Sequence, residues 1–258
     1  KGDGSVVIED LPGIYSLSPY TPEEVVARGY LVNENPDAIL NIVDATNIER
    51  NLYLTTQLRE LGIPMVVALT MIDLARNRGD QIDLRKLGGL LGCEVVETSA
   101  LKGEGCVQAV RKAAELSGTS CAGAPRVFAD SVERALAHIA SLICRPGSGV
   151  AESLGRWYAV KLFERDERAA AELNLSQAVK AQIEESIKAC EAEMDDDAES
   201  IVSNQRYAFI GRLVSQCVRK GRPKGALTAS DRIDRVITNR WEALPIFAAI
   251  MFLGYYVR

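Results

Sequence analysis

The chain has 258 residues, a formal net charge of -5 and a composition that is 47% hydrophobic and 25% charged. These values are typical of a globular protein with one large domain or two ordinary ones. The acidic balance argues against a nucleic-acid-binding protein, which needs an excess of basic side chains on one face. Six cysteines without a C-x-x-C pair and a single histidine exclude a recognisable zinc site and indicate reduced thiols in the cytosol.

Short β-branched runs alternate with amphipathic stretches over about the first 120 residues, a pattern typical of βαβ units around a mostly parallel sheet. The runs predict strands, and the stretches between them have apolar residues at helical spacing. Because strand carboxyl ends face loops in such an α/β fold, a ligand site is expected at that edge. The strands are expected over 5–9, 38–44, 64–70 and 93–99, and the helices over 22–34, 47–61, 83–91 and 105–116.

Small and flexible residues at 117–126 predict a linker after this α/β part. From there to about residue 220 strand-like alternation is missing, and recurring helical patterns predict an all-α bundle of antiparallel helices. The helices of this bundle are expected over 131–143, 155–164, 176–194 and 199–220. The sequence therefore predicts three parts, namely 1–120, 126–222 and a membrane-proximal segment at 230–258.

The last part holds a nearly continuous apolar run at 243–257 that contains no charged residue. A membrane-spanning helix needs about 20 such residues, so this run is either a buried terminal helix or the first part of a longer membrane helix. Trp241, directly after Arg240, is typical of an anchor at the edge of a bilayer. The membrane interpretation is therefore favoured, and the start of a transmembrane helix is expected here.

The sequence D-L-P-G follows the first predicted strand, with Asp10 at the strand end and Gly13 three residues later. An aspartate in this place can hold a magnesium ion through water, and a glycine after a tight turn offers its backbone N–H to a terminal phosphate. An ordinary turn rich in Asp, Pro and Gly has the same composition. Taken alone, the motif leaves both interpretations open.

A second motif, T-M-I-D, follows the strand expected over 64–70 and places Thr70 and Asp73 at its end. A carboxylate there can accept two hydrogen bonds from the ring N–H and the exocyclic amine of guanine, which adenine does not offer. The alternative is that Asp73 is the N-cap of a following helix. The motif therefore indicates either a guanine contact or a helix start.

A third motif, T-S-A at Thr98, Ser99 and Ala100, follows the next strand. The backbone N–H of Ala100 could donate to the carbonyl oxygen of guanine, although a plain loop between strand and helix looks similar. The order D-x-x-G, T-x-x-D and S-A at successive strand ends resembles the P-loop GTPase superfamily over residues 5–117. Three weak signals in this order are jointly much stronger than any one of them.

Residues 43–73 specifically resemble the cytoplasmic G domain of FeoB, the bacterial ferrous iron transporter, and 206–214 and 230–247 resemble its helical domain and membrane entry. The resemblance implies a partial P-loop GTPase domain, a helical domain and the start of a transmembrane helix. It also implies GTP or GDP and Mg²⁺ as ligands, with Asp10 as the magnesium-linked acid and residues 13–24 as a switch. The GTP-binding residues would be Asp10, Leu11, Pro12, Gly13, Thr70, Met71, Ile72, Asp73, Thr98, Ser99 and Ala100.

The same resemblance implies partners and a location. The partner would be the protein's own membrane domain, with Fe²⁺ as the transported ion bound there and no nucleic acid involved. The protein would then lie at the cytoplasmic face of the bacterial inner membrane as part of a multi-pass protein. The sequence leaves the oligomeric state open, a homo-oligomer included.

Departures from the superfamily pattern limit the expected activity. The phosphate-binding G-x-x-x-x-G-K-[ST] element and the first switch are expected upstream of Lys1, and a chain without them should bind GTP poorly. Ile14 follows Gly13 where Ras-like GTPases carry a water-orienting glutamine, so slow hydrolysis is expected and no catalytic residue is assigned. Thr70 and Met71 replace the usual asparagine and lysine, which predicts modest affinity for the base.

Two functions of other classes stay open at this point. One is a soluble regulatory GTPase of the ribosome or RNA, in which the terminal apolar run would belong to the core. The acidic charge and the missing basic stripe argue against it. The other is a catalytically inactive interaction module that naturally has no phosphate-binding loop.

Overall fold

The structure is a computed structural model that describes residues 6–18, 21–119, 123–145, 150–221, 251–252 and 255. The chain forms two compact units, residues 1–219 and 220–258. In the second unit the predicted apolar run 243–257 lies outside the described residues except for Met251, Phe252 and Tyr255, which are helical. Within the described part of the chain, none of the helices has the length and apolar character needed to cross a bilayer.

Three of the four predicted strands form one parallel sheet in the order β1, β2, β4. They are β1 (Ile39–Asp44), β2 (Met65–Thr70) and β4 (Glu94–Glu97), and Asp44 pairs with Thr70 while Leu69 pairs with Glu97. The central strand β2 is buried from Met65 to Leu69, as its continuous apolar run requires. The expected parallel α/β fold is therefore confirmed.

The strand predicted over 5–9 is wrong for the residues that the structure describes. Residues 6–9 form no strand, and the side chain of Val7 is 92% exposed. A strand exists only through hydrogen bonds to a neighbouring strand, and an apolar run without a bonded neighbour stays irregular. The composition of this run is right for a strand, but the described sheet supplies no neighbour for it.

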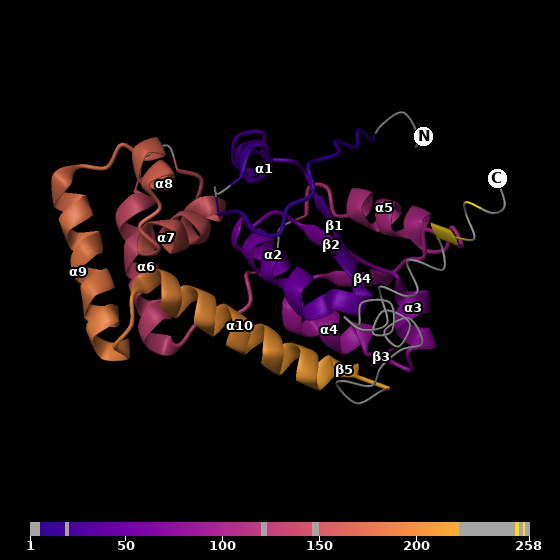
Figure 1. Ribbon diagram of the computed structural model, residues 1–258. Helices are drawn as coiled ribbons and strands as arrows, with labels where there is room; N and C mark the ends of the chain where they lie inside the picture. The colour runs from indigo at the N-terminus through magenta and orange to yellow at the C-terminus, as the bar shows by residue number, and fades with distance from the viewer. Residues whose placement is uncertain are drawn as a thin grey trace. The chain divides into compact units, whose positions relative to one another are not determined.

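Helices cover both faces of the sheet (Figure 1). On one face α2 (Ile48–Glu60) and α4 (Leu84–Leu91) share a core with Val67 and Leu69 of β2. On the other face α5 (Cys106–Glu115) packs its Ala109 against Val66, Ala68 and Val96. These helices lie where the sequence predicts them, because alternate residues of β2 point to opposite faces and Met65 to Leu69 are all apolar.

Helix α1 (Pro22–Asn33) also lies where the sequence predicts it, and it precedes β1. The Thr21 hydroxyl accepts from the Glu24 N–H, and the Glu24 carboxylate accepts from the Thr21 N–H. This capping box, with Pro22 in the first turn, fixes the start of the helix. The segment 14–18 therefore leads into a helix whose first residue is well defined.

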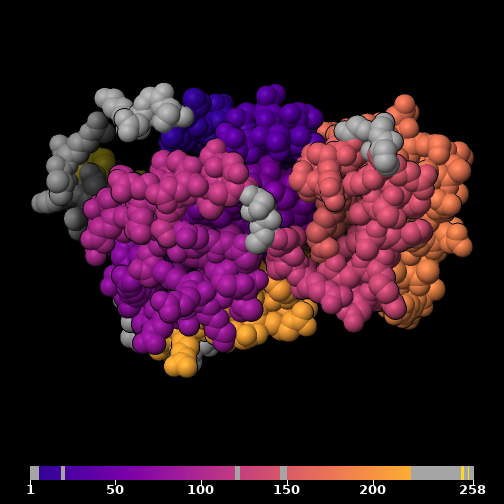
Figure 2. Space-filling model, turned by 180° about the vertical axis from the view of Figure 1, so that it is seen from behind, coloured from indigo at the N-terminus to yellow at the C-terminus, as the bar shows by residue number. Residues whose placement is uncertain are grey.

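Several short elements were not predicted. The 3₁₀ turn η1 (Ala45–Asn47) follows β1, and α3 (Ile72–Asn77) follows β2. Two-residue strands β3 (Gln81–Ile82) and β5 (Val218–Arg219) pair antiparallel, and the Asp83 N–H donates to the Cys217 carbonyl over 2.8 Å. In the view from behind, the orange surface near the end of α10 borders the purple surface of the sheet part (Figure 2).

The second half of the first unit is helical, as predicted. Three of these helices begin at a residue with a capping side chain: Asp166, Ser176 and Asp197 each accept a backbone N–H. The short helices η2 and α8 were not predicted. The elements are α6 (Asp130–Ile143), η2 (Glu152–Leu154), α7 (Gly155–Phe163), α8 (Glu167–Glu172), α9 (Gln177–Met194) and α10 (Ala198–Cys217).

Two buried ion pairs join helices of the sheet part to this helical part. Arg28 of α1 donates to Asp166 over 2.6 Å, and Arg206 of α10 donates to Glu60 of α2 over 2.8 Å. Burial raises the pKa of Asp166, but hydrogen bonds from the Ala169 N–H and from Arg28 outweigh it and lower the pKa overall. Both carboxylates are thus held by partners that replace the lost water.

Candidate functional site

The carboxyl ends of the three parallel strands lie side by side, and a polar residue stands at each end. Asp44 ends β1 and accepts hydrogen bonds from the Thr46 N–H and hydroxyl and from the Asn47 amide. Burial raises the pKa of Asp44, and these hydrogen bonds outweigh it and lower the pKa overall. This carboxylate shapes the turn into α2, a role that sequence reasoning did not assign to it.

The motif at the end of β2 forms a sharp turn into α3. Met71 has a left-handed backbone with φ of +55° and a side chain that is 45% exposed, and Ile72 next to it is buried. Asp73 lies in the first turn of α3, not at its N-cap, because the N-cap position is Met71 and makes no side-chain capping bond. The alternative interpretation of Asp73 as an N-cap is therefore wrong, and Thr70 and Asp73 are both half-buried at the sheet edge.

The motif at the end of β4 is joined directly to the end of β2. The N–H and the hydroxyl of Thr98 both donate to the carbonyl oxygen of Leu69, over 2.8 and 3.3 Å. Thr98 and Ser99 are buried, and Ala100 is exposed. The structure thus brings the second and third motifs together and leaves Ala100 as the member of its motif that faces solvent.

The loop after Ala100 is closed upon itself. Ser99 and Glu104 exchange two backbone hydrogen bonds of 3.0 and 3.1 Å, and the Lys102 N–H donates to the Ser99 hydroxyl over 3.4 Å. The Ser99 hydroxyl therefore shapes this loop. Gly105 follows with φ of +77°, and a Cβ there would lie 1.9 Å from the Glu97 carbonyl oxygen. Only glycine fits such a backbone approach.

Gly105→Ala is expected to lower the free energy of unfolding by about 2–5 kcal/mol, because the added methyl group would meet backbone and the residue would also keep a left-handed conformation. Gly103→Ala is the matched control: its φ is +70°, yet no atom lies within 4 Å of its Cβ position. That control carries left-handed strain alone, so a loss of about 1 kcal/mol is expected. Thermal unfolding of both variants tests this, and equal losses would contradict the close approach.

A cavity of about 340 Å³ lies beside these two loops, between α3, β4 and α5. Its lining includes Ile72, Thr98 and Ser99 of the predicted site. Arg76 of α3 and Glu97 of β4 form an exposed ion pair of 2.5 Å in its wall. Sequence reasoning missed this pair, since neither residue belongs to a motif and only the fold brings them together.

The first motif lies in the irregular segment that precedes α1. Asp10, Pro12 and Gly13 are exposed, whereas Leu11 and Ile14 pack against the core. Mg²⁺ in nucleotide sites is held by one or two carboxylates together with phosphate oxygens and water, and the single exposed carboxylate of Asp10 fits that role. Across the described ranges no group of three or more His, Cys, Asp or Glu residues is arranged to hold a metal without such help.

Two family models match the chain. The model described as "Ferrous iron transport protein B" matches residues 1–113, and the "FeoB cytosolic helical domain" model matches residues 128–219. The chain is 36% identical to a fusion protein of Fe²⁺ transport protein A and the Fe²⁺ transporter FeoB from Porphyromonas gingivalis, over 98% of the chain and 31% of that protein. It is 32% identical to the Fe²⁺ transporter FeoB of Salmonella typhimurium, over 98% of the chain. The chain spans about a third of the length of these relatives, 31% and 32%.

Solved structures agree with this match. NFeoB of S. thermophilus bound to mGMPPNP is 47% identical, with a TM-score of 0.75, over 84% of this chain and 80% of that one. The same protein bound to GDP.AlF4⁻ and K⁺ is 50% identical, with a TM-score of 0.76, over 80% and 79%. At this sequence identity and coverage, this chain and NFeoB are homologous and share a fold. The chain therefore belongs to the FeoB family of ferrous iron transport proteins.

Proposed function

We propose that this chain is the guanine-nucleotide-binding and helical cytosolic portion of a Fe²⁺ transporter. The observation that carries the proposal is the hydrogen bonding of Thr98 to the Leu69 carbonyl, which sets the T-M-I-D and T-S-A loops side by side. The related NFeoB structures are bound to GDP, GDP.AlF4⁻ and mGMPPNP, and they are 47–50% identical to this chain. GTP and GDP are therefore the proposed ligands.

The base would be read by Asp73 and by the backbone of Ala100. Asp73 would accept from the ring N–H and the exocyclic amine of guanine, and the backbone N–H of Ala100, an exposed residue, would donate to its carbonyl oxygen. Thr70, Met71 and Ile72 would shape the turn that presents Asp73. Thr98 and Ser99 would take part by fixing the second loop, because their polar groups bond within the protein.

The phosphates would lie near the first motif. Gly13 would offer its N–H to the terminal phosphate, with Leu11 and Pro12 fixing the turn between it and Asp10. When bound, Mg²⁺ neutralises charge on the phosphate oxygens, and Asp10 would hold it through water. Ile14 is not a base, so hydrolysis would be slow and would depend on groups outside this segment.

In the whole protein the nucleotide would regulate iron uptake. The proposed parts are a partial G domain at 1–120, a helical domain at 126–222 and a membrane-proximal segment at 230–258. The partner would be the protein's own membrane domain, through which Fe²⁺ passes, at the cytoplasmic face of the inner membrane. Full-length relatives are named as Fe²⁺ transporters, which supports this role.

Asp10→Asn in the full-length protein is expected to weaken Mg²⁺-dependent binding of GMPPNP by about tenfold, because the amide holds the hydrated ion poorly. Titration of a fluorescent GMPPNP with and without EDTA measures the effect, and adenine nucleotides should compete poorly. Glu9→Gln removes a neighbouring exposed carboxylate and is the control. Equal affinity of the unaltered protein for GDP and ADP would contradict the proposed function.

A further inference from the structure

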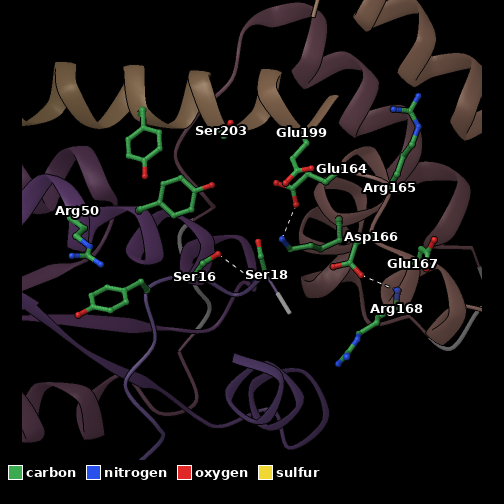
Figure 3. A pocket seen from close by; sticks show the side chains of 14 residues that line it. Ser16, Ser18, Arg50, Glu164, Arg165, Asp166, Glu167, Arg168, Glu199 and Ser203 are labelled. Atoms are coloured by element: carbon green, nitrogen blue, oxygen red, sulfur yellow. Dashed lines mark hydrogen bonds and ion pairs between the residues drawn. The ribbon is translucent and has the colours of Figure 1, made fainter. Parts of the chain in front are cut away.

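The chain that follows Gly13 is fastened to α2 by one buried side chain. The Leu17 N–H donates to Oε1 of Gln57 over 2.8 Å, and the Ser16 hydroxyl lies 3.3 Å from both Oε1 and Nε2 of the same amide. The Ser16 hydroxyl in turn accepts from the Ser18 N–H over 3.0 Å. Figure 3 shows Ser16 and Ser18 in the wall of a cavity of about 660 Å³, with Arg50 nearby.

Gln57 is an unusual residue for this position. It is 1% exposed, in the part of α2 that faces the core, where an apolar side chain would otherwise be expected. Its amide forms hydrogen bonds with Ser16 and Leu17, and Leu17 is itself completely buried. A buried amide is retained at a cost in desolvation, so its partners indicate what it positions.

The residue just before this anchor is held more loosely. The guanidinium of Arg50 lies over the ring of Tyr15 at 4.1 Å, but Tyr15 is 59% exposed. Such an exposed stacking contact is weak beside a buried hydrogen bond. Upstream of it, Asp10, Pro12 and Gly13 are exposed as well. The hydrogen-bonded anchor therefore begins at Ser16, and upstream of it the contacts with the core are the apolar ones of Leu11 and Ile14.

We propose that Gln57 is a positioning residue for the terminal phosphate of the nucleotide. Gly13 is three residues upstream of Ser16, and three residues of extended chain span at most about 10 Å. With Ser16 and Leu17 fixed by Gln57, the Gly13 N–H is confined to a small region around that anchor. This inference rests on the proposed function. Within the switch expected over 13–24 it assigns Ser16 and Leu17 as the fixed point, since both bond to Gln57 of α2.

Gln57→Leu in the full-length protein keeps the size of the side chain and removes the hydrogen bonds to Ser16 and Leu17. We expect the ratio of GMPPNP affinity to GDP affinity to fall about tenfold, the effect of one buried hydrogen bond, with GDP affinity unchanged. Gln57→Glu keeps the acceptor for the Leu17 N–H and should restore most of the ratio. Fluorescent-nucleotide titration measures all three proteins.

Thr55→Val is the matched control. Thr55 lies on the same helix, is completely buried, and bonds to the Asn41 amide of β1 over 2.8 Å, away from the switch segment. This variant loses a comparable buried hydrogen bond, so it should lower stability but leave the GMPPNP to GDP ratio unchanged. An unchanged ratio in Gln57→Leu, or an equal change in Thr55→Val, would overturn the inference. Failure of the unaltered protein to bind GDP at all would refute the proposed function instead.

Discussion

Asp73→Asn in the full-length protein is expected to replace a preference for guanine nucleotides with a preference for xanthine nucleotides. The Asp73 carboxylate would accept two hydrogen bonds from guanine, and an amide offers one acceptor and one donor in its place. Xanthine carries a carbonyl oxygen where guanine carries the exocyclic amine, so the amide donor matches it. Hydrogen bonds to a charged group contribute about 1.5–3 kcal/mol each, so GDP affinity should fall by about 100-fold or more.

Competition between GDP and XDP for a fluorescent nucleotide measures this exchange. Asp37→Asn removes one exposed carboxylate in the loop before β1 and should leave the preference for GDP intact. Unchanged selectivity in Asp73→Asn would mean that guanine is read elsewhere. Loss of all nucleotide binding, with no gain for XDP, would instead indicate that Asp73 maintains the turn into α3.

The strands that could be predicted from the sequence are those that pair with another apolar strand in the sheet. β1, β2 and β4 each bury residues against helices on both sides, so their composition alone distinguishes them from loops. The run at 5–9 has the same composition, yet a strand also needs a hydrogen-bonded neighbour. β3 forms only through its pairing with β5, which lies more than a hundred residues later in the chain. Local sequence contains no signal for such a pair.

The motifs of the candidate site could be predicted because they lie at strand ends, which the hydrophobic pattern locates. The sequence did not indicate which residues of these motifs bond within the protein and which stay exposed to a ligand. The side chains of Thr98 and Ser99 form hydrogen bonds with backbone groups of the protein, whereas Ala100 is exposed to solvent. Gln57 belongs to no sequence motif, and its bond to Leu17 could be recognised only from the fold, which places α2 beside Leu17. The glycines around Glu104 were a readable signal for the closed loop.

Glu60→Leu is expected to destabilise the chain by about 3–5 kcal/mol, because it leaves the guanidinium of Arg206 buried without its counter-charge. Both side chains of this pair are almost completely buried, and Arg206 also donates to the Thr56 hydroxyl over 3.1 Å. Burial alone would lower the pKa of Arg206, but the charge and hydrogen bonds of Glu60 raise it overall. Thermal unfolding of the full-length protein measures this loss of stability. The single variant Arg206→Met should lose nearly as much stability as Glu60→Leu.

The double variant Glu60→Leu with Arg206→Met distinguishes the pair's contribution from the cost of an orphaned charge. Nε of Arg206 has no hydrogen-bond partner among the described residues, so the guanidinium is incompletely satisfied even in the native protein. Replacing both members with apolar side chains should therefore recover most of the stability, as often happens for buried ion pairs. If the double variant is as unstable as the sum of the single ones, packing of the stems and not charge pairing joins α10 to α2. In that case the contacts of Arg206 with the Tyr53 and Phe128 rings would be the stabilising ones.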